Sequence, residues 1–177
     1  DFYYSNNKSL SDLLNYVESS PIILLTGETR TGKTKAFQQI ENRLATSGKY
    51  VKYLKYEEFK GADFKSYITK LILKKYGMDE FCGFTHFFNR GEAIIILDEI
   101  KNGVNEKKLI EILQNFKKLG KNQLFLGVEE KVGDKIEEML NPKVIKLMPL
   151  TEKEEKVFLL NILRENCDRR GLQFNYS

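Results

Sequence analysis

The chain has 177 residues, of which 41% are hydrophobic and 31% charged, and its formal net charge is +4. This composition indicates a folded globular domain and argues against a disordered chain. The mild basic excess permits contact with nucleic acid but does not by itself indicate it. No apolar run approaches the roughly 20 residues of a membrane-spanning helix, so we expect no membrane insertion. Two cysteines far apart in the sequence, Cys82 and Cys167, disfavour a disulfide framework and favour a cytoplasmic protein.

Predicted helices and strands alternate along the chain. Apolar residues at helical spacing predict a leading helix over 8–19, which ends before Pro21. Strands are predicted at 22–26, 50–56, 93–97, 123–128 and 143–147. Helices are predicted after the first strand to about residue 47, and over about 63–77, 105–120 and 131–140. Asp63 and Asn105 are the predicted caps of the second and third of these helices. The segment 78–91 has no clear pattern. The alternation predicts an α/β domain over 1–148, with a parallel sheet and helices on both of its faces.

The segment Gly27-Glu28-Thr29-Arg30-Thr31-Gly32-Lys33-Thr34 fits the pattern G-x-x-x-x-G-K-T. It stands between a predicted strand and a predicted helix, which is the context of a phosphate-binding loop. Glycines at both ends let the backbone N–H groups turn toward one anion, which the following helix also attracts. We expect nucleotide phosphates at Gly27, Glu28, Thr29, Arg30, Thr31, Gly32, Lys33, Thr34 and Lys35. Lys33 would contact the β- and γ-phosphates, and the Thr34 hydroxyl would bind Mg²⁺.

Two adjacent carboxylates, Asp98 and Glu99, follow the apolar run at 93–97. Such a run predicts a strand that is buried on both faces, and ligands of α/β folds gather at the carboxyl ends of these strands. We expect Asp98 to hold the magnesium, directly or through water. Glu99 would polarise the water that attacks the γ-phosphate. The alternative interpretation is that Asp98 caps the next helix and that Glu99 is a solvated surface residue.

With both motifs in place, the chain resembles the additional-strand class of P-loop ATPases, and within it the AAA+ and STAND-type ATPases. The two motifs match their Walker A and Walker B sequences. The segments 124–130 and 147–155 are similar to the fourth strand and the start of the lid in initiator-type AAA+ proteins, ExeA-type ATPases and transposition-associated ATP-binding proteins. The resemblance implies a three-layer fold whose sheet has the order 5-1-4-3-2, with the predicted strands numbered along the chain. It also implies that 149–177 form the start of a helical lid.

The same resemblance implies that the domain binds ATP with Mg²⁺ and hydrolyses it to ADP and phosphate, with Glu99 and Lys33 as catalytic residues. Energy from this cycle would drive a conformational change or assembly. The full-length protein would form a homo-oligomer with ATP and have a DNA or protein partner. Because the chain does not begin with methionine, we expect it to be trimmed or to be a domain of a longer protein. The adenine pocket is expected around Tyr16, Ile22 and Pro149.

The sequence departs from the family pattern in three places. The fourth predicted strand ends in Gly127 and Glu129 where a polar sensor is usual, and no arginine stands between Gly91 and Leu163, where an arginine finger is usual. The lid segment stops before a sensor arginine can be identified. These departures keep a second interpretation open, in which the domain is a nucleotide-gated switch or scaffold with little turnover. A small-molecule kinase is disfavoured because such enzymes seldom carry the Asp-Glu pair.

Overall fold

We describe a computed structural model that places residues 2–4, 10–27, 32–58, 63–148 and 152–171. The elements of these residues, in chain order, are β1 (Phe2–Tyr4), α1 (Leu10–Val17), β2 (Ile22–Thr26), α2 (Lys33–Leu44), β3 (Tyr50–Lys55), α3 (Phe64–Tyr76), α4 (Met78–Asn89), β4 (Ala93–Ile100), α5 (Glu106–Lys117), β5 (Gln123–Val128), α6 (Glu130–Leu140), β6 (Lys143–Leu147) and α7 (Glu152–Arg169).

One parallel sheet of six strands organises the domain, in the order β1-β6-β2-β5-β4-β3. The predicted order 5-1-4-3-2 therefore needs correction, because it lacks the edge strand Phe2–Tyr4. Three residues are too few to show a period-two pattern, and this strand is recognised only by its pairing with β6. By their residues, the predicted strands 5, 1, 4, 3 and 2 correspond to β6, β2, β5, β4 and β3. Their order relative to one another is therefore as predicted.

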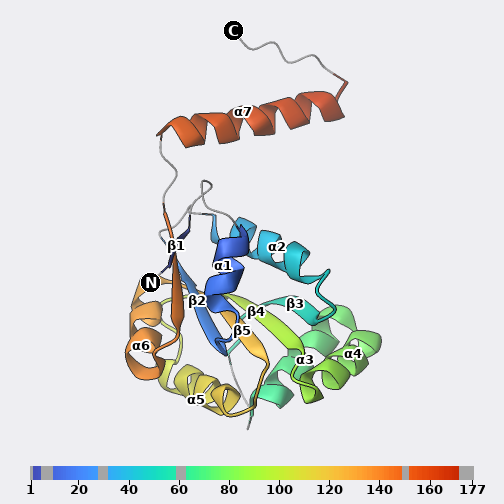
Figure 1. The fold of residues 1–177 in the computed structure, drawn as a ribbon, viewed down its shortest axis with the longest axis vertical. Helices are drawn as coiled ribbons and strands as arrows, with labels where there is room; N and C mark the ends of the chain where they lie inside the picture. Colours follow the sequence, from blue (N-terminus) through green and yellow to red (C-terminus); the bar gives the residue numbers. More distant parts are fainter. Residues whose placement is uncertain (1, 5–9, 28–31, 59–62, 149–151, 172–177) are drawn as a thin grey trace.

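The sheet is the middle of three layers (Figure 1). Successive residues of a strand point to opposite faces. On β2, Ile23 and Leu25 pack with the helices α1 and α2, whereas Ile22 and Leu24 pack with α3, α4, α5 and α6. Helices on both sides explain why β2 and residues 93–97 of β4 are continuous apolar runs and not alternating ones.

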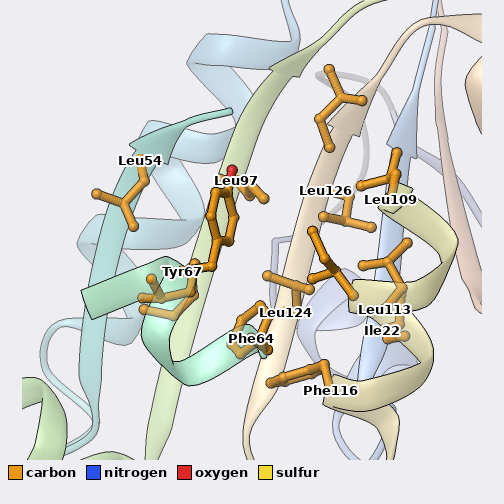
Figure 2. Packing of buried hydrophobic residues seen from close by; sticks show 14 of the residues in the cluster. Ile22, Leu54, Phe64, Tyr67, Leu97, Leu109, Leu113, Phe116, Leu124 and Leu126 are labelled. Carbon is orange, nitrogen blue, oxygen red and sulfur yellow. The ribbon is translucent and has the colours of Figure 1, made fainter. Parts of the chain in front are cut away.

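The larger core lies between the sheet and the four helices α3–α6 (Figure 2). Phe64 of α3 and Phe116 of α5 are buried, with ring centroids 4.5 Å apart. Leu124 and Leu126 of β5 are fully buried and belong to the same cluster. This packing fixes the helices α3–α6 against one face of the sheet.

Most predicted helix boundaries agree with the structure. The side chains of Asp63 and Asn105 cap α3 and α5, as expected from their place before apolar helical segments. In the described residues the leading helix is Leu10–Val17, which is shorter than the predicted 8–19. The unassigned segment 78–91 contains α4, whose buried Phe84 and Phe88 stand one helical turn apart.

The helix α7 follows the last strand and lies apart from the three layers (Figure 1). It exposes the apolar side chains of Val157, Leu159, Ile162 and Leu163. No helix among the described residues has the length and apolar character needed to cross a membrane.

Candidate functional site

The two glycines of the phosphate-loop motif flank the segment that joins β2 to α2. Gly27 directly follows β2, and Gly32 directly precedes α2. Gly32 has φ 83°, in the left-handed region that glycine adopts without a steric penalty, and its carbonyl accepts the Ala36 N–H at 2.9 Å. The predicted phosphate contacts of Glu28, Thr29, Arg30 and Thr31 lie outside the described residues.

The next three predicted residues, Lys33, Thr34 and Lys35, form the first turn of α2. Lys33 is half-buried, and its Nζ donates to the Val128 carbonyl at 3.2 Å, at the end of β5. The first turn of a helix is where backbone N–H groups can bind an anion. The Lys35 side chain is exposed.

Asp98 is a buried carboxylate, with only 3% of its surface exposed. Its Oδ2 accepts from the Tyr53 hydroxyl at 2.5 Å and from the Thr34 hydroxyl at 3.5 Å, and its Oδ1 accepts the Glu99 N–H at 2.8 Å. A buried charge is costly unless hydrogen bonds compensate it. These bonds therefore compensate the burial of the Asp98 carboxylate and fix its orientation.

Sequence reasoning missed Tyr53. It lies on β3, where it pairs with Ile96, and its ring packs on the same face of the sheet as Phe37 of α2. Burial raises the pKa of the Tyr53 hydroxyl well above its ordinary value, and the Asp98 carboxylate raises it further. The hydroxyl therefore stays protonated and donates to Asp98. Only the register between β3 and β4 could have revealed this contact, and the sequence does not show it.

Glu99 lies at an irregularity of β4, where the pairing with β5 shifts between Leu97 and Ile100. Its φ is 63°, a left-handed value that is uncommon for residues with a side chain. Such irregularities redirect a side chain out of the regular alternation. The Glu99 carboxylate is exposed, and its Oε1 lies 3.7 Å from Nζ of Lys55.

The alternative interpretation of Asp98 as a helix cap is wrong. The next helix, α5, begins at Glu106 and is capped by Asn105. Asp98 is instead part of β4, which continues to Ile100. The other half of that interpretation, a solvated Glu99, is compatible with the exposed side chain.

Gly127 of β5 stands directly against Asp98. A Cβ atom at this position would overlap Oδ1 of Asp98 and would lie 2.7 Å from Cε2 of Phe37. The family resemblance implies a polar sensor near this position. The structure gives a different reason for the glycine, which is the space that the Asp98 carboxylate occupies.

A cavity of about 260 Å³ adjoins the start of the phosphate loop. It is lined by Tyr3, Thr26, Gly27, Glu130, Asp134, Glu137, Lys146, Leu147 and Met148. Tyr16 and Ile22, the residues expected near adenine, line a different cavity of about 300 Å³. Ile22 begins β2, whereas Gly27 follows its end. The predicted pair therefore lies near the amino-terminal end of β2, away from the loop. Pro149 lies outside the described residues.

The residues around Asp98 fit a magnesium ion. Mg²⁺ prefers oxygen ligands and usually takes one or two from the protein, together with phosphate oxygens and water. Asp98 offers a buried carboxylate, and Thr34 offers a hydroxyl directed at the same oxygen. In the described part of the chain, no three His, Cys, Asp or Glu side chains gather into a larger metal cluster.

No protein-family model matches this chain, and no curated protein matches its sequence significantly. Solved structures do match its fold. AMPPCP-bound DnaA from Aquifex aeolicus has a TM-score of 0.52 and 14% identity, over 98% of this chain and 55% of that one. The Aeropyrum pernix ORC2 protein has a TM-score of 0.51 and 17% identity, over 88% of this chain and 48% of that one. Caenorhabditis elegans PCH-2 has a TM-score of 0.51 and 15% identity, over 88% of this chain and 42% of that one.

These neighbours are AAA+ P-loop ATPases, and the chain has their fold. It spans about half of the length of each of them. The expected P-loop ATPase architecture is thereby confirmed at the level of the fold, with the strand order corrected as above.

Proposed function

We propose that this domain binds ATP with Mg²⁺ and hydrolyses it to ADP and phosphate. One observation carries the proposal. Thr34 and Asp98, 64 residues apart in the sequence, bring a hydroxyl and a buried carboxylate within 3.5 Å of each other. They meet beside Lys33, at the carboxyl ends of the central strands, where α2 begins.

Each residue has a separate task in this proposal. Lys33, released from the Val128 carbonyl, would bind the β- and γ-phosphates together with the N–H groups of the loop. Thr34 and Asp98 would hold the magnesium, which supplies positive charge to the phosphate oxygens. Glu99, at the exposed end of β4, would orient the attacking water and accept its proton. Such catalysis consists mostly of positioning and electrostatic stabilisation.

We propose that adenine occupies the cavity of about 260 Å³ beside Gly27. Tyr3, Leu147 and Met148 would contact the flat apolar faces of the base. Three carboxylates of α6, from Glu130, Asp134 and Glu137, also line the cavity and could accept hydrogen bonds from an amino group. The solved structures offer support by analogy, since the DnaA neighbour is bound to AMPPCP and the ORC2 neighbour is an ADPNP–ADP complex.

A nucleotide-gated switch with little turnover is the second candidate. The Glu99 carboxylate lies near the Lys55 ammonium and not in the Asp98 cluster, and Gly127 offers no polar sensor. Both observations favour a domain that binds ATP more readily than it hydrolyses it. Binding and turnover must therefore be measured separately.

The wider role is also a proposal. We infer that 149–177 begin a helical lid, because α7 exposes apolar side chains that a partner segment would cover. An AAA+ protein of the initiator, ExeA or transposition type, or a STAND-type ATPase, would assemble into a homo-oligomer and act on DNA or a protein in the cytoplasm. One DnaA neighbour is a complex with single-stranded DNA, which supports testing DNA first.

The test combines calorimetry with Mg²⁺ and ATP and an assay of phosphate release, each with and without single-stranded DNA. Tight binding with phosphate release above a no-enzyme control supports the ATPase. Tight binding with no release above that control, with or without DNA, supports the switch. Absence of nucleotide binding would refute both.

A further inference from the structure

We propose that Tyr53 is a positioning residue that holds the Asp98 carboxylate in the orientation needed to bind the metal ion. The inference rests on the proposed function, because it assigns a task to a residue beside the metal site. Neither nucleotide-binding motif includes Tyr53, which lies on β3, whereas Asp98 lies on β4.

The contacts of Asp98 are divided between its two oxygens. Tyr53 donates to Oδ2 at 2.5 Å, and the Glu99 N–H donates to Oδ1 at 2.8 Å. Bonds to both oxygens prevent rotation of the carboxylate group. An ionised carboxylate oxygen can accept more than one partner. The Tyr53 hydroxyl therefore leaves Oδ2 able to receive the ion from the side of Thr34, whose hydroxyl lies 3.5 Å away.

Tyr53 itself is held by three residues from two helices. Its backbone carbonyl accepts from the Tyr76 hydroxyl at 2.8 Å and from Nζ of Lys75 at 3.3 Å, both at the end of α3. Nζ of Lys75 also lies 5.2 Å from the centroid of the Tyr53 ring. On another side the ring packs against Phe37 of α2, with the centroids 6.5 Å apart. A donor fixed in this way can orient a carboxylate, whereas a mobile one could not.

Two other tasks for Tyr53 lead to different outcomes. If the hydroxyl competed with the ion for Oδ2, its removal would strengthen metal binding. If the hydroxyl only compensated the burial of Asp98, its removal would lower the stability of the fold and leave metal affinity unchanged. Positioning alone predicts weaker metal binding in a protein that remains folded.

The test is Tyr53→Phe, which removes the hydroxyl and keeps the ring. The matched control is Tyr50→Phe on the same strand, because the Tyr50 hydroxyl bonds to the Glu80 carbonyl and carboxylate and does not contact Asp98. Calorimetry gives the ATP affinity of each variant in excess EDTA and then the Mg²⁺ affinity of each protein–ATP complex. Thermal melting checks that both variants are folded.

We expect Tyr53→Phe to bind ATP in EDTA as the parent does and to bind Mg²⁺ about 10- to 100-fold more weakly, the usual effect of losing a partner that orients a metal ligand. Tyr50→Phe should change neither affinity. Equal or tighter Mg²⁺ binding by Tyr53→Phe would overturn the inference. If Tyr53→Phe does not fold, Tyr53→Leu, which removes the ring as well as the hydroxyl, is measured in the same way against Tyr50→Leu as its matched control. A parent protein that binds no ATP would refute the proposed function. If the parent binds Mg²⁺ and ATP and Tyr53→Phe binds both with the same affinities, only the role of Tyr53 is refuted.

Discussion

Gly127 of β5 and Asp98 of β4 are packed so closely that a Cβ atom on the glycine would overlap Oδ1 of the aspartate. Phe37 of α2 closes the same space from another side, 2.7 Å from that Cβ position. Three elements thus meet around one buried carboxylate, with no room left for a methyl group. The metal site that we propose depends on this glycine as much as on its polar residues.

Gly127→Ala should therefore disturb both the fold and the site. Forcing a methyl group into a packed core typically costs about 1–3 kcal/mol, and here the Asp98 carboxylate is the group displaced. We expect a lower midpoint in urea unfolding and weaker Mg²⁺-dependent ATP binding. The control is Gly83→Ala, because a Cβ there meets only Tyr50, at 3.4 Å. Its expected effect is neutral or stabilising by up to about 1 kcal/mol, since alanine favours a helix.

Lys33→Ala should weaken nucleotide binding. A hydrogen bond to a charged group contributes about 1.5–3 kcal/mol, so the affinity for ATP should fall about tenfold or more. Calorimetry measures this directly. The control Lys49→Ala removes the same charge from an exposed residue outside the loop and should bind ATP as the parent does. Unchanged ATP affinity in Lys33→Ala would contradict the assignment of the phosphate loop.

The sequence predicted the parts of this fold that depend on local pattern. The five longer strands, the helix caps Asp63 and Asn105 and the glycine turn before α2 all follow from residue order alone. The edge strand β1 did not, because its three residues are recognised only through pairing with β6. The contact of Tyr53 with Asp98 was equally hidden, since it depends on the register of β3 and β4 and joins two residues that are 45 positions apart in the chain.

Phe116→Ala should destabilise the fold strongly. The ring is 2% exposed and packs against Phe64 with a centroid distance of 4.5 Å. Truncating a buried phenylalanine typically costs about 3–5 kcal/mol, because burial is lost and a cavity remains. Urea unfolding gives the difference. Leu119→Ala is the control, because Leu119 is 39% exposed and such changes usually stay within about 0.5 kcal/mol. Similar unfolding midpoints for the two variants would show that α5 does not support the core.

Lys55→Ala should have only a small effect on turnover. The side chains of Lys55 and Glu99 are 63% and 47% exposed, and their charged atoms are 3.7 Å apart. An exposed ion pair of this kind contributes at most about 1 kcal/mol, which corresponds to a rate change of about fivefold or less. Lys74→Ala, which removes an exposed pair with Glu57, is the control. A much larger change in phosphate release for Lys55→Ala would mean that the pair controls the position of Glu99.

Asp98→Asn and Glu99→Gln should separate the tasks of two neighbouring carboxylates. Asp98 is buried among the donors of Tyr53, Thr34 and the Glu99 N–H, whereas the Glu99 side chain is exposed. Loss of the charge at Asp98 should therefore weaken Mg²⁺-dependent ATP binding. Loss of the charge at Glu99 should leave that binding unchanged.

Glu99→Gln should instead remove most of the phosphate release, because loss of a positioned base typically lowers the rate about 10²–10⁴-fold. The variant would bind Mg²⁺ and ATP as the parent does and hold ATP without hydrolysing it. Calorimetry and phosphate release, measured on the same preparations, give both quantities. If Glu99→Gln releases phosphate at the parent rate, comparison with a no-enzyme control separates two explanations. A parent rate above that control would mean that Glu99 is only a solvated residue, and a parent rate equal to it would mean that the domain is a switch and not an ATPase.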